Sequence, residues 1–382
     1  MTASGASSTP LPKTTAVAVV WGGIGDIFLA SGGLEAFRVS VALSHQPVLV
    51  CEKRSAGASP FLASDWQLET LTPVARHPVL QRLSLFFKAW QTLSRLNPEI
   101  VVTNGTHPLL PVLLWLSGAK QRIGYQTLKG SWVQRLAQRL CLTQRIPLNT
   151  QRYAGHMYAT VYAPGMPHAS LPSLELLRHQ DACTRMMSWL ERQTLRKQGY
   201  VLVHPGCSTL SKQKGIDKEW ASADWVQWLQ HYTDSSLPYP VVLVGGPDDT
   251  SIIQTLQEAP ELQQAWQRGR LIQGYGVTRS LQDLGVLIEY AKVFVCIDSS
   301  PLQLGIASST PVVTLFGPTD PFKIIPPAVL EAGKVQVVTV DTPLACQPCL
   351  WDKRTTCCDT PVCLSIAPEK VQQAVENLCQ CY

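Results

Sequence analysis

The sequence is poor in charged residues and has no long hydrophobic run. Only 15% of its 382 residues are charged, and the formal net charge of +5 is too weak to indicate a nucleic-acid-binding protein. The longest apolar run, Leu109–Leu116, is far shorter than the ~20 residues that cross a bilayer. The N-terminal residues lack the apolar stretch of a secretory signal, so we expect a cytoplasmic protein.

What the sequence does contain is enough apolar surface for two hydrophobic cores. Hydrophobic residues make up 45% of the chain, including 11 Trp, which excludes a disordered protein. The 25 Gly and 28 Pro are close to ordinary usage and exclude a collagen-like chain. A length of 382 residues corresponds to about two domains.

The charge is distributed unevenly along the chain. Residues 1–150 hold 14 Lys and Arg against 6 Asp and Glu, a net charge of +8, whereas residues 151–382 hold 18 against 21, a net charge of −3. A basic first half favours an acidic partner, which could be a phosphorylated ligand, an anionic lipid surface or nucleic acid. A basic face that is merely solvated is the alternative.

Short β-branched runs alternate with helical segments, which is typical of a parallel sheet covered by helices. The first run, Ala16–Trp21, is unbroken and apolar, as expected for a strand buried on both faces. A second set begins near residue 200, after a proline-containing stretch at 163–172. The sequence therefore predicts an α/β protein with two doubly wound, Rossmann-like domains that face each other across a cleft. We expect a flexible tail at 1–14, a first domain at 15–180, a second domain at 181–345, and a cysteine-rich tail with a C-terminal helix at 346–382.

Ligands of open α/β sheets bind beyond the carboxyl ends of the strands, and the first such loop runs from Gly22 to Asp26. Its glycines allow backbone N–H groups to approach a ligand, and the next helix offers its positive N-terminus. The loop does not complete the G-x-G-x-x-G pattern, and no Gly-Lys-Ser/Thr of a P-loop follows it. Asp26 is therefore either a reactive carboxylate or simply the N-cap of the helix.

Three further loops follow predicted strand ends in the second half of the chain. Residues 204–212 offer hydroxyl groups, amides and the Lys212 ammonium, which can neutralise a diphosphate; a polar surface loop is the alternative. Residues 298–303 place Asp298 before a short helix with Pro301 in its first turn. The free N–H groups of that turn can bind an anion; the alternative is that Asp298 simply caps the helix. Residues 316–321 are rich in turn residues and are expected to line the same cleft.

These four loops, in this order, resemble glycosyltransferase family 9, the ADP-heptose:lipopolysaccharide heptosyltransferase-like enzymes. The resemblance rests on GGIGDIFLASGGLEAFR from residue 22, AKQRIGY from 119, HPGCSTLSK from 204, VVLVGGPDD from 241, FGPTDP from 316 and CQPC…CL…IAPEKV from 346. It implies a GT-B fold, in which the first domain binds the acceptor and the second binds the nucleotide-sugar donor. It also implies that the last helix, at about 368–379, returns toward the first domain.

The activity implied by the resemblance is an inverting, metal-independent transfer of a sugar, expected to be heptose from ADP-heptose, to a hydroxyl group of a lipopolysaccharide-type or other anionic glycan. No cofactor and no nucleic-acid partner are expected, and the chain contains no D-x-D sequence. Asp26 would be the general base, and Lys212 would stabilise the leaving diphosphate. The implied donor-binding residues are His204, Gly206, Ser208, Thr209, Gly246, Asp298, Ser299, Ser300 and Gln303. The implied acceptor-binding residues are Gly23, Gly25, Lys53, Arg54, Arg135 and Arg139.

The chain departs from the family pattern at the third loop, where the family usually has Asp-(Ser/Thr)-Gly-Pro-x-His. Ser300 replaces the Gly and can crowd a phosphate near the backbone. Gln303 replaces the His and cannot carry a positive charge. The identity of the nucleotide-sugar donor is therefore left open. A nucleotide-sugar epimerase or hydrolase of the same shape, and an inactive sugar-nucleotide-binding or metal-bearing protein, are the alternative functions.

The C-terminal cysteines form the pattern Cys346-x₂-Cys349-x₈-Cys358-x₄-Cys363. Four thiolates can hold zinc tetrahedrally, although the spacing of the second pair is not standard. We expect a structural tail with reduced thiols or an occasional disulfide and no catalytic metal. A metal or iron–sulfur site is the alternative, and these four cysteines are then the candidate ligands. Because the acceptor would be an anionic glycolipid, peripheral contact with the inner face of the membrane is expected.

Overall fold

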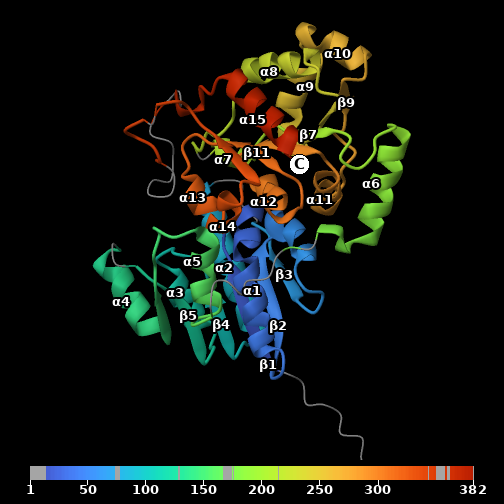
Figure 1. Ribbon diagram of the computed structural model, residues 1–382. Coiled ribbons are helices and arrows are strands. Elements are labelled where there is room, and N and C mark those ends of the chain that lie inside the picture. Colours follow the sequence, from blue (N-terminus) through green and yellow to red (C-terminus); the bar gives the residue numbers. More distant parts are fainter. Residues whose placement is uncertain are drawn as a thin grey trace, which may run out of the picture.

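The computed structural model describes residues 14–73, 78–127, 130–166, 174, 176–213, 215–342, 344–349, 358 and 362–381. The tail expected at 1–14 lies, up to residue 13, outside this part of the chain. The described residues form two α/β domains, each built on its own sheet, with the first domain below the second in Figure 1.

The first sheet has six parallel strands in the spatial order β3-β2-β1-β4-β5-β6. Its strands are β1 (Thr14–Val20), β2 (His45–Glu52), β3 (Gln67–Leu71), β4 (Ile100–Thr103), β5 (Gln121–Gln126) and β6 (Gln144–Pro147). Its helical segments are α1 (Ile24–Val41), η1 (Lys53–Phe61), α2 (Pro78–Leu96), α3 (Leu110–Leu116), α4 (Trp132–Cys141) and α5 (Ala154–Tyr162). The central strand β1 is apolar and buried from Ala16 to Val20, because helices cover both faces of a parallel sheet.

The second sheet also has six parallel strands, in the order β12-β11-β10-β7-β8-β9. Its strands are β7 (Val201–His204), β8 (Val241–Leu243), β9 (Leu271–Gln273), β10 (Val293–Ile297), β11 (Val312–Leu315) and β12 (Val335–Val338). Its helices are α6 (Gln180–Arg192), α7 (Thr209–Gln213), α8 (Ser222–Asp234), α9 (Thr250–Glu258), α10 (Gln263–Gln267), α11 (Leu281–Glu289), α12 (Ser300–Ala307), α13 (Pro321–Ile324), α14 (Pro327–Glu331) and α15 (Pro368–Cys381). The short 3₁₀ segments are η3 (Leu176–Arg178), η4 (Pro247–Asp249), η5 (Pro260–Leu262) and η6 (Val362–Leu364).

Both sheets have the strand order of a doubly wound domain, with the first strand of each set beside the fourth. The order reverses between β1 and β4 in the first sheet and between β7 and β10 in the second. Such a switch point is where ligands bind in open α/β sheets. The prediction of two Rossmann-like, doubly wound domains is confirmed, and the predicted site loops after β1, β7 and β10 lie at these switch points.

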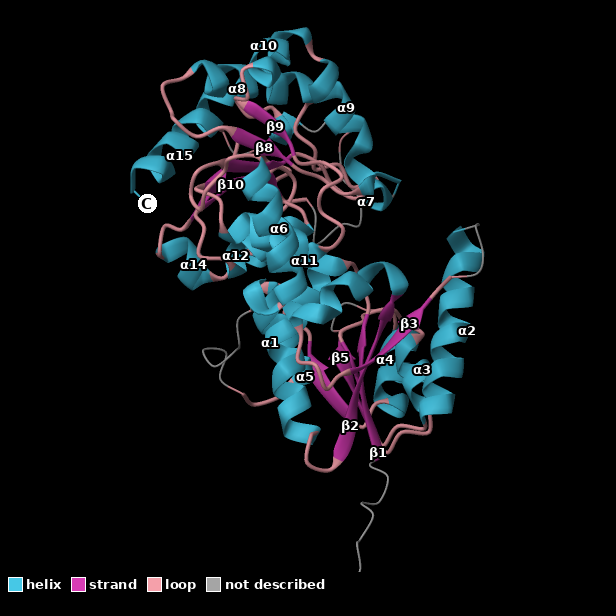
Figure 2. Cartoon of the chain, turned by 90° about the vertical axis from the view of Figure 1, so that its right-hand side faces the viewer, coloured by secondary structure: helices cyan, strands magenta, loops and turns pink. Residues whose placement is uncertain are grey.

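The two domains are joined by packed side chains as well as by the chain itself. Phe28 and Phe61 of the first domain belong to one continuous apolar cluster with Leu284 and Leu302 of the second. Helix α1 packs against α12, and η1 packs against α11. Figure 2 shows α1, α11 and α12 between the two sheets.

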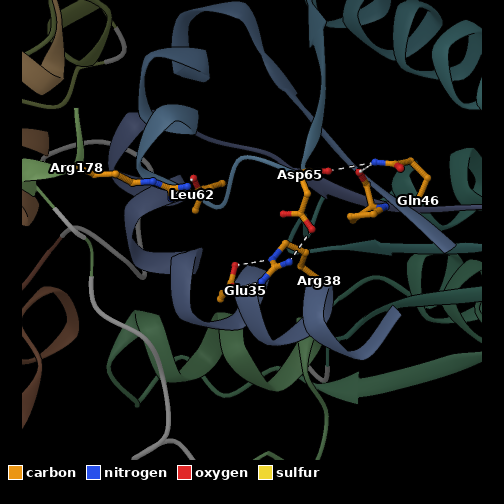
Figure 3. Close-up of polar contacts among 7 residues, drawn as sticks. Glu35, Arg38, Gln46, Leu62, Asp65 and Arg178 are labelled. Carbon is orange, nitrogen blue, oxygen red and sulfur yellow. Dashed lines mark hydrogen bonds and ion pairs between the residues drawn. The ribbon is translucent and has the colours of Figure 1, made fainter. Parts of the chain in front are cut away.

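Polar contacts tie the segment before α6 to the first domain. Arg178 donates a hydrogen bond to the Leu62 carbonyl at 3.2 Å, as Figure 3 shows, and His179 Nε2 lies 2.9 Å from the Pro60 carbonyl oxygen. On the same side of the first domain, Arg38 pairs with both Glu35 and Asp65. The start of the second domain is thereby fixed to η1 and the residue that follows it.

The C-terminal helix does not return to the first domain as the family resemblance implied. Helix α15 packs on α8, β10, β11 and β12, all of which belong to the second domain (Figure 1). Its apolar residues Val371, Val375 and Leu378 join the core that contains the α8 tryptophans. Burial of this apolar face holds the helix on the second sheet.

Candidate active site

The Asp26 side chain is fixed in the first turn of α1 by two hydrogen bonds. Helix α1 begins at Ile24 with Gly23 as its N-cap, so Asp26 is the third helical residue and not the N-cap that the sequence allowed. Its Oδ2 accepts the Gly23 N–H at 2.7 Å, and its Oδ1 accepts the Tyr158 hydroxyl at 2.7 Å. The carboxylate is therefore held at both oxygens while it lies at the carboxyl end of β1.

Gly22 makes room for this carboxylate. Its φ of +139° is a backbone conformation that favours glycine. A Cβ atom at position 22 would lie 2.1 Å from Asp26 Oδ2, an overlap that would force the Asp26 side chain to move. The glycine is required both by its own backbone and by the Asp26 side chain that packs on it.

Burial raises the pKa of Asp26 above its ordinary value, because a desolvated carboxylate is penalised. The hydrogen bonds from Tyr158 and Gly23, and the positive charges of Arg54 and Lys218, offset part of this rise. Burial also raises the pKa of Tyr158 well above its usual range, and the negative charge of Asp26 adds to the effect. Tyr158 therefore stays protonated and acts as a donor to Asp26.

The second domain presents its own polar groups opposite Asp26. Strand β10 ends at Ile297, and Asp298 follows it immediately before α12. A Cβ atom built on Gly25 would lie 4.0 Å from the Ser300 Cβ, so the first turns of α1 and α12 are in close approach. Asp298 does not cap α12, because the N-cap is Ser299.

Lys218 connects these groups and was not predicted from the sequence. Its Nζ donates to Asp298 Oδ2 at 2.6 Å, and its positive charge acts on the Asp26 carboxylate. Lys212, the predicted catalytic cation, instead pairs with Glu219 Oε2 at 2.6 Å and is exposed. Lys218 and Arg54 are the positive charges whose effect on the pKa of Asp26 is evident.

Three lysines, Lys212, Lys214 and Lys218, follow β7 within a few residues of one another. The sequence alone does not identify which of them lies near the first domain. Only the tertiary structure distinguishes Lys218, because it pairs with Asp298, the residue that follows β10. The assignment of Lys212 as a catalytic residue stays a prediction.

His204 and Asp249 form a buried polar pair beneath the loop after β7. His204 Nε2 lies 3.4 Å from Asp249 Oδ2, and the same oxygen accepts the Gly246 N–H at 2.7 Å. Burial lowers the pKa of His204 and raises that of Asp249. A Cβ atom on Gly206 would lie 2.1 Å from Asp249 Oδ1. The His204–Asp249 pair therefore packs directly under the backbone of Gly206, which is a predicted donor-binding residue.

The other predicted donor-binding side chains are placed at the loop after β7 and on α12. Ser208 and Thr209 are exposed, and Ser299 Oγ donates to the Ile297 carbonyl at 3.4 Å. Gln303 is buried and donates from Nε2 to the Ile324 carbonyl at 3.2 Å. The residue that replaces the family His thus binds within its own domain, to the end of α13.

The predicted acceptor-binding residues fall into two groups. Gly23 and Gly25 lie at the start of α1 beside Asp26, whereas Lys53 and Arg54 begin η1. The positive charge of Arg54 lowers the pKa of Asp26, and Arg54 pairs with Glu52 at 2.7 Å. Arg135 and Arg139 lie exposed on α4, which packs on α3 and β5. The structure brings Gly23, Gly25 and Arg54 to Asp26 and places Arg135 and Arg139 on another helix.

The C-terminal cysteines lie close enough to influence one another. Burial raises the pKa of Cys363 to about 11, and the nearby thiols of Cys358, Cys349 and Cys346 add to this rise. Within the part of the chain that the structure describes, no group of three or more His, Cys, Asp or Glu side chains is arranged to hold a metal ion.

Comparison with known proteins agrees with this architecture. Residues 86–356 match the pattern of glycosyltransferase family 9 (heptosyltransferase). Lipopolysaccharide heptosyltransferase 3 of Escherichia coli strain K12 is 30% identical over 126 residues, which is 32% of this chain and 32% of that protein. The match therefore spans about a third of that curated relative.

Two solved structures share the fold over nearly their whole length. The glycosyl transferase family 9 protein of Veillonella parvula superposes with a TM-score of 0.71 at 18% identity, covering 96% of this chain and 98% of that one. The ADP-heptose lps heptosyltransferase II of E. coli superposes with a TM-score of 0.65 at 15% identity, covering 96% and 99%. These similarities confirm the GT-B type of fold that the sequence resemblance implied.

Proposed function

Because the chain belongs to glycosyltransferase family 9, we propose that it transfers a sugar from a nucleotide-sugar donor to a hydroxyl group of an anionic glycan acceptor. The proposed donor is ADP-heptose and the proposed acceptor is of the lipopolysaccharide type. The transfer inverts the anomeric centre and needs no metal ion. The observation that supports the proposal is the packing of the first turn of α1, which carries Asp26, against the first turn of α12 at the other domain's switch point. The positive charge of Lys218, which pairs with Asp298 just before α12, also acts on Asp26.

Asp26 has the properties of a general base. Each of its oxygens accepts one hydrogen bond in the structure, and a carboxylate oxygen has a second lone pair that can accept another. An acceptor hydroxyl bonded there loses its proton to Asp26 as its oxygen attacks the anomeric carbon. The raised pKa of Asp26 makes it a stronger base than an exposed aspartate.

The leaving group departs on the opposite side of the sugar, toward the second domain. As the bond between the anomeric carbon and the phosphate oxygen breaks, negative charge grows on the diphosphate. The Lys218 ammonium and the free N–H groups at the start of α12 provide positive potential for that charge. Attack from one domain and departure toward the other is the geometry of a single displacement, which inverts the anomeric centre.

Positive charge from the protein takes the place that a divalent cation holds in metal-dependent transferases. Lys218 is within hydrogen-bond distance of Asp298, so the same ammonium can contact a phosphate oxygen and stay oriented by the carboxylate. Lys212, Ser208 and Thr209 remain the predicted contacts for the outer part of the diphosphate. Asp298 is then a positioning residue that orients Lys218.

Transfer is tested with the full chain, ADP-heptose and a lipopolysaccharide inner-core acceptor, by mass spectrometry of the acceptor and NMR of the new anomeric centre. We expect a product one heptose heavier with inverted configuration, unchanged by EDTA. Incubation with the donor alone separates the alternatives, because an epimerase or a hydrolase alters the donor without an acceptor. Donor turnover that needs no acceptor, or a retained configuration, contradicts the proposal.

A further inference from the structure

Helix α4 is amphipathic in the opposite sense to an ordinary surface helix. Its glutamines face the protein: Gln138 is buried and bonds to Thr127, and Gln134 donates to the Thr106 carbonyl at 3.1 Å. Its apolar side chains face outward, and Trp132 and Leu140 are 70% and 68% exposed. A helix that only met water would present the glutamines and bury the tryptophan and leucines.

The exposed apolar side chains of α4 continue over two neighbouring helices. Helix α3 packs against both α2 and α4, and Figure 2 shows α2, α3 and α4 on the same side of the first sheet. Ten exposed large apolar residues, which we call the α2–α4 face, gather here. They are Leu83, Phe87, Trp90, Leu109, Trp115, Leu116, Trp132, Val133, Leu136 and Leu140. Exposed large apolar side chains grouped on adjoining helices in this way indicate an interaction site.

The segment that carries the α2–α4 face is strongly basic, although Arg95 at the end of α2 pairs with Glu69. Residues 70–174 contain 11 Lys and Arg and a single acidic residue, Glu99. Helices α2, α3 and α4 contain no Asp or Glu. Arg135 and Arg139 flank the apolar side of α4, and within the described residues neither has an acidic partner. The surroundings are therefore complementary to a surface that is both apolar and anionic.

We propose that the α2–α4 face binds the surface of an anionic lipid bilayer, with α4 lying in the interface. Tryptophans at a rim of arginines are characteristic of helices that lie in the headgroup region. Arginines near an anionic surface add attraction. Among the described residues no helix is long and apolar enough to span a bilayer, so the contact is with one leaflet.

The α2–α4 face is connected to the active site by a short stretch of the first domain. Thr106, which accepts a hydrogen bond from α4, lies two residues after Asn104. Asn104 Oδ1 accepts the Trp21 N–H at 2.9 Å, and Trp21 directly precedes the Gly22–Asp26 loop. Docking through α4 therefore holds the carboxyl edge of the first sheet at the lipid surface, where a lipid-linked acceptor is anchored.

Binding is tested by sedimentation of the full chain with vesicles of equal parts phosphatidylglycerol and phosphatidylethanolamine, and with vesicles of phosphatidylcholine alone. These vesicles carry no sugar acceptor, so the result does not depend on the proposed transfer. We expect the chain to bind the anionic vesicles at least about tenfold more tightly than the neutral ones. Equal binding to both, or binding to neither, overturns the proposal.

The residues are tested with the triple variant Trp132→Ser, Leu136→Ser, Leu140→Ser. Its binding to anionic vesicles should fall at least about tenfold, since three outward apolar groups are lost, while its melting temperature is unchanged. The matched control is Val39→Ser, Leu43→Ser, which removes apolar groups that are 60% and 95% exposed at the end of α1 and should bind as the native chain does. Unchanged binding by the triple variant overturns the proposal.

A second measurement guards against misfolding of the triple variant and against self-association. Brominated lipids should quench the fluorescence of the native chain, and Trp132→Phe should lose part of that quenching with its fold intact. Gel filtration without vesicles should give the same elution for the native chain and the triple variant. A native dimer that the triple variant abolishes assigns the α2–α4 face to a second copy of the chain and overturns the proposal, as does quenching that Trp132→Phe leaves unchanged.

Discussion

Replacement of Asp26 by Asn separates the chemical role of this residue from its structural role. The amide is nearly isosteric with the carboxylate, and its oxygen can still accept the Gly23 N–H that now lies 2.7 Å from Oδ2. Its nitrogen can donate to the Tyr158 hydroxyl, which reverses the direction of the 2.7 Å hydrogen bond. The first turn of α1 should therefore keep its geometry in Asp26→Asn.

Activity should nevertheless be lost, because an amide cannot take the acceptor proton. General base catalysis contributes about 10²- to 10⁴-fold, which corresponds to about 3–5 kcal/mol of activation free energy. In steady-state transfer assays at saturating donor, kcat should fall by that factor. Donor binding measured by calorimetry should be unchanged, since Asp26 lies in the first domain, which is proposed to bind the acceptor.

Stability should change in the opposite direction. Burial raises the pKa of Asp26 from 3.8, so the folded state penalises the ionised form. The sign follows from linkage: stability from Asp26 is fully present below pH 3.8 and is lost as the pH rises through the folded-state pKa. At neutral pH, Asp26→Asn should therefore melt at the same or a higher temperature than the native chain.

The control is Asp65→Asn, which removes an exposed carboxylate of the same domain that pairs with Arg38. It should keep full activity and nearly native stability, because an exposed ion pair contributes little. Two results would refute the reasoning on Asp26: kcat of Asp26→Asn within tenfold of native, or a melting temperature several degrees lower.

Three further variants examine the groups around Asp26. Tyr158→Phe removes a hydrogen bond that lowers the pKa of Asp26, so the acidic limb of the pH–rate profile should move to higher pH. An unmoved limb would show that Tyr158 does not influence the pKa of the catalytic base. Lys218→Ala should lower kcat by about 10²- to 10³-fold, as for the loss of one transition-state donor, and Lys212→Ala should lower it less; the reverse order would restore Lys212 as the main catalytic cation. Gly22→Ala should displace the carboxylate and lower kcat by more than about tenfold, whereas Gly118→Ala, with a φ of +75° and open space around its Cβ, should cost only about 1 kcal/mol of stability. Equal kinetics for the two glycine variants would contradict the packing argument.

The parts of the fold that the sequence predicts are those whose residues serve only the core. Strand β10 is recognisable because VFVCI has no polar position, and β1 for the same reason. Strands β3 and β6, QLETL and QRIP, lie at the two edges of the first sheet and are half polar. Their pairing comes from neighbours far along the chain, so no local pattern indicates them.

The candidate site divides in the same way. The loop that carries Asp26 is predictable because glycines and a carboxylate follow an apolar strand. The partner of Asp26 is not, because Tyr158 lies 132 residues away within a helix that reads as ordinary core. Lys218 pairs with Asp298, which lies 80 residues further along the chain. The sequence does not reveal that contact, and it favoured Lys212 instead.

One local arrangement occurs twice in the molecule, with different outcomes. In Gly22-Gly23-x-x-Asp26 and Gly245-Gly246-x-x-Asp249, the aspartate accepts the N–H of the second glycine at 2.7 Å. Asp26 meets a tyrosine and the opposite domain, whereas Asp249 meets a buried histidine beneath its own loop. The same five-residue turn thus carries the proposed general base in one domain and a buried His–Asp pair in the other, so this sequence signature alone does not identify a catalytic residue.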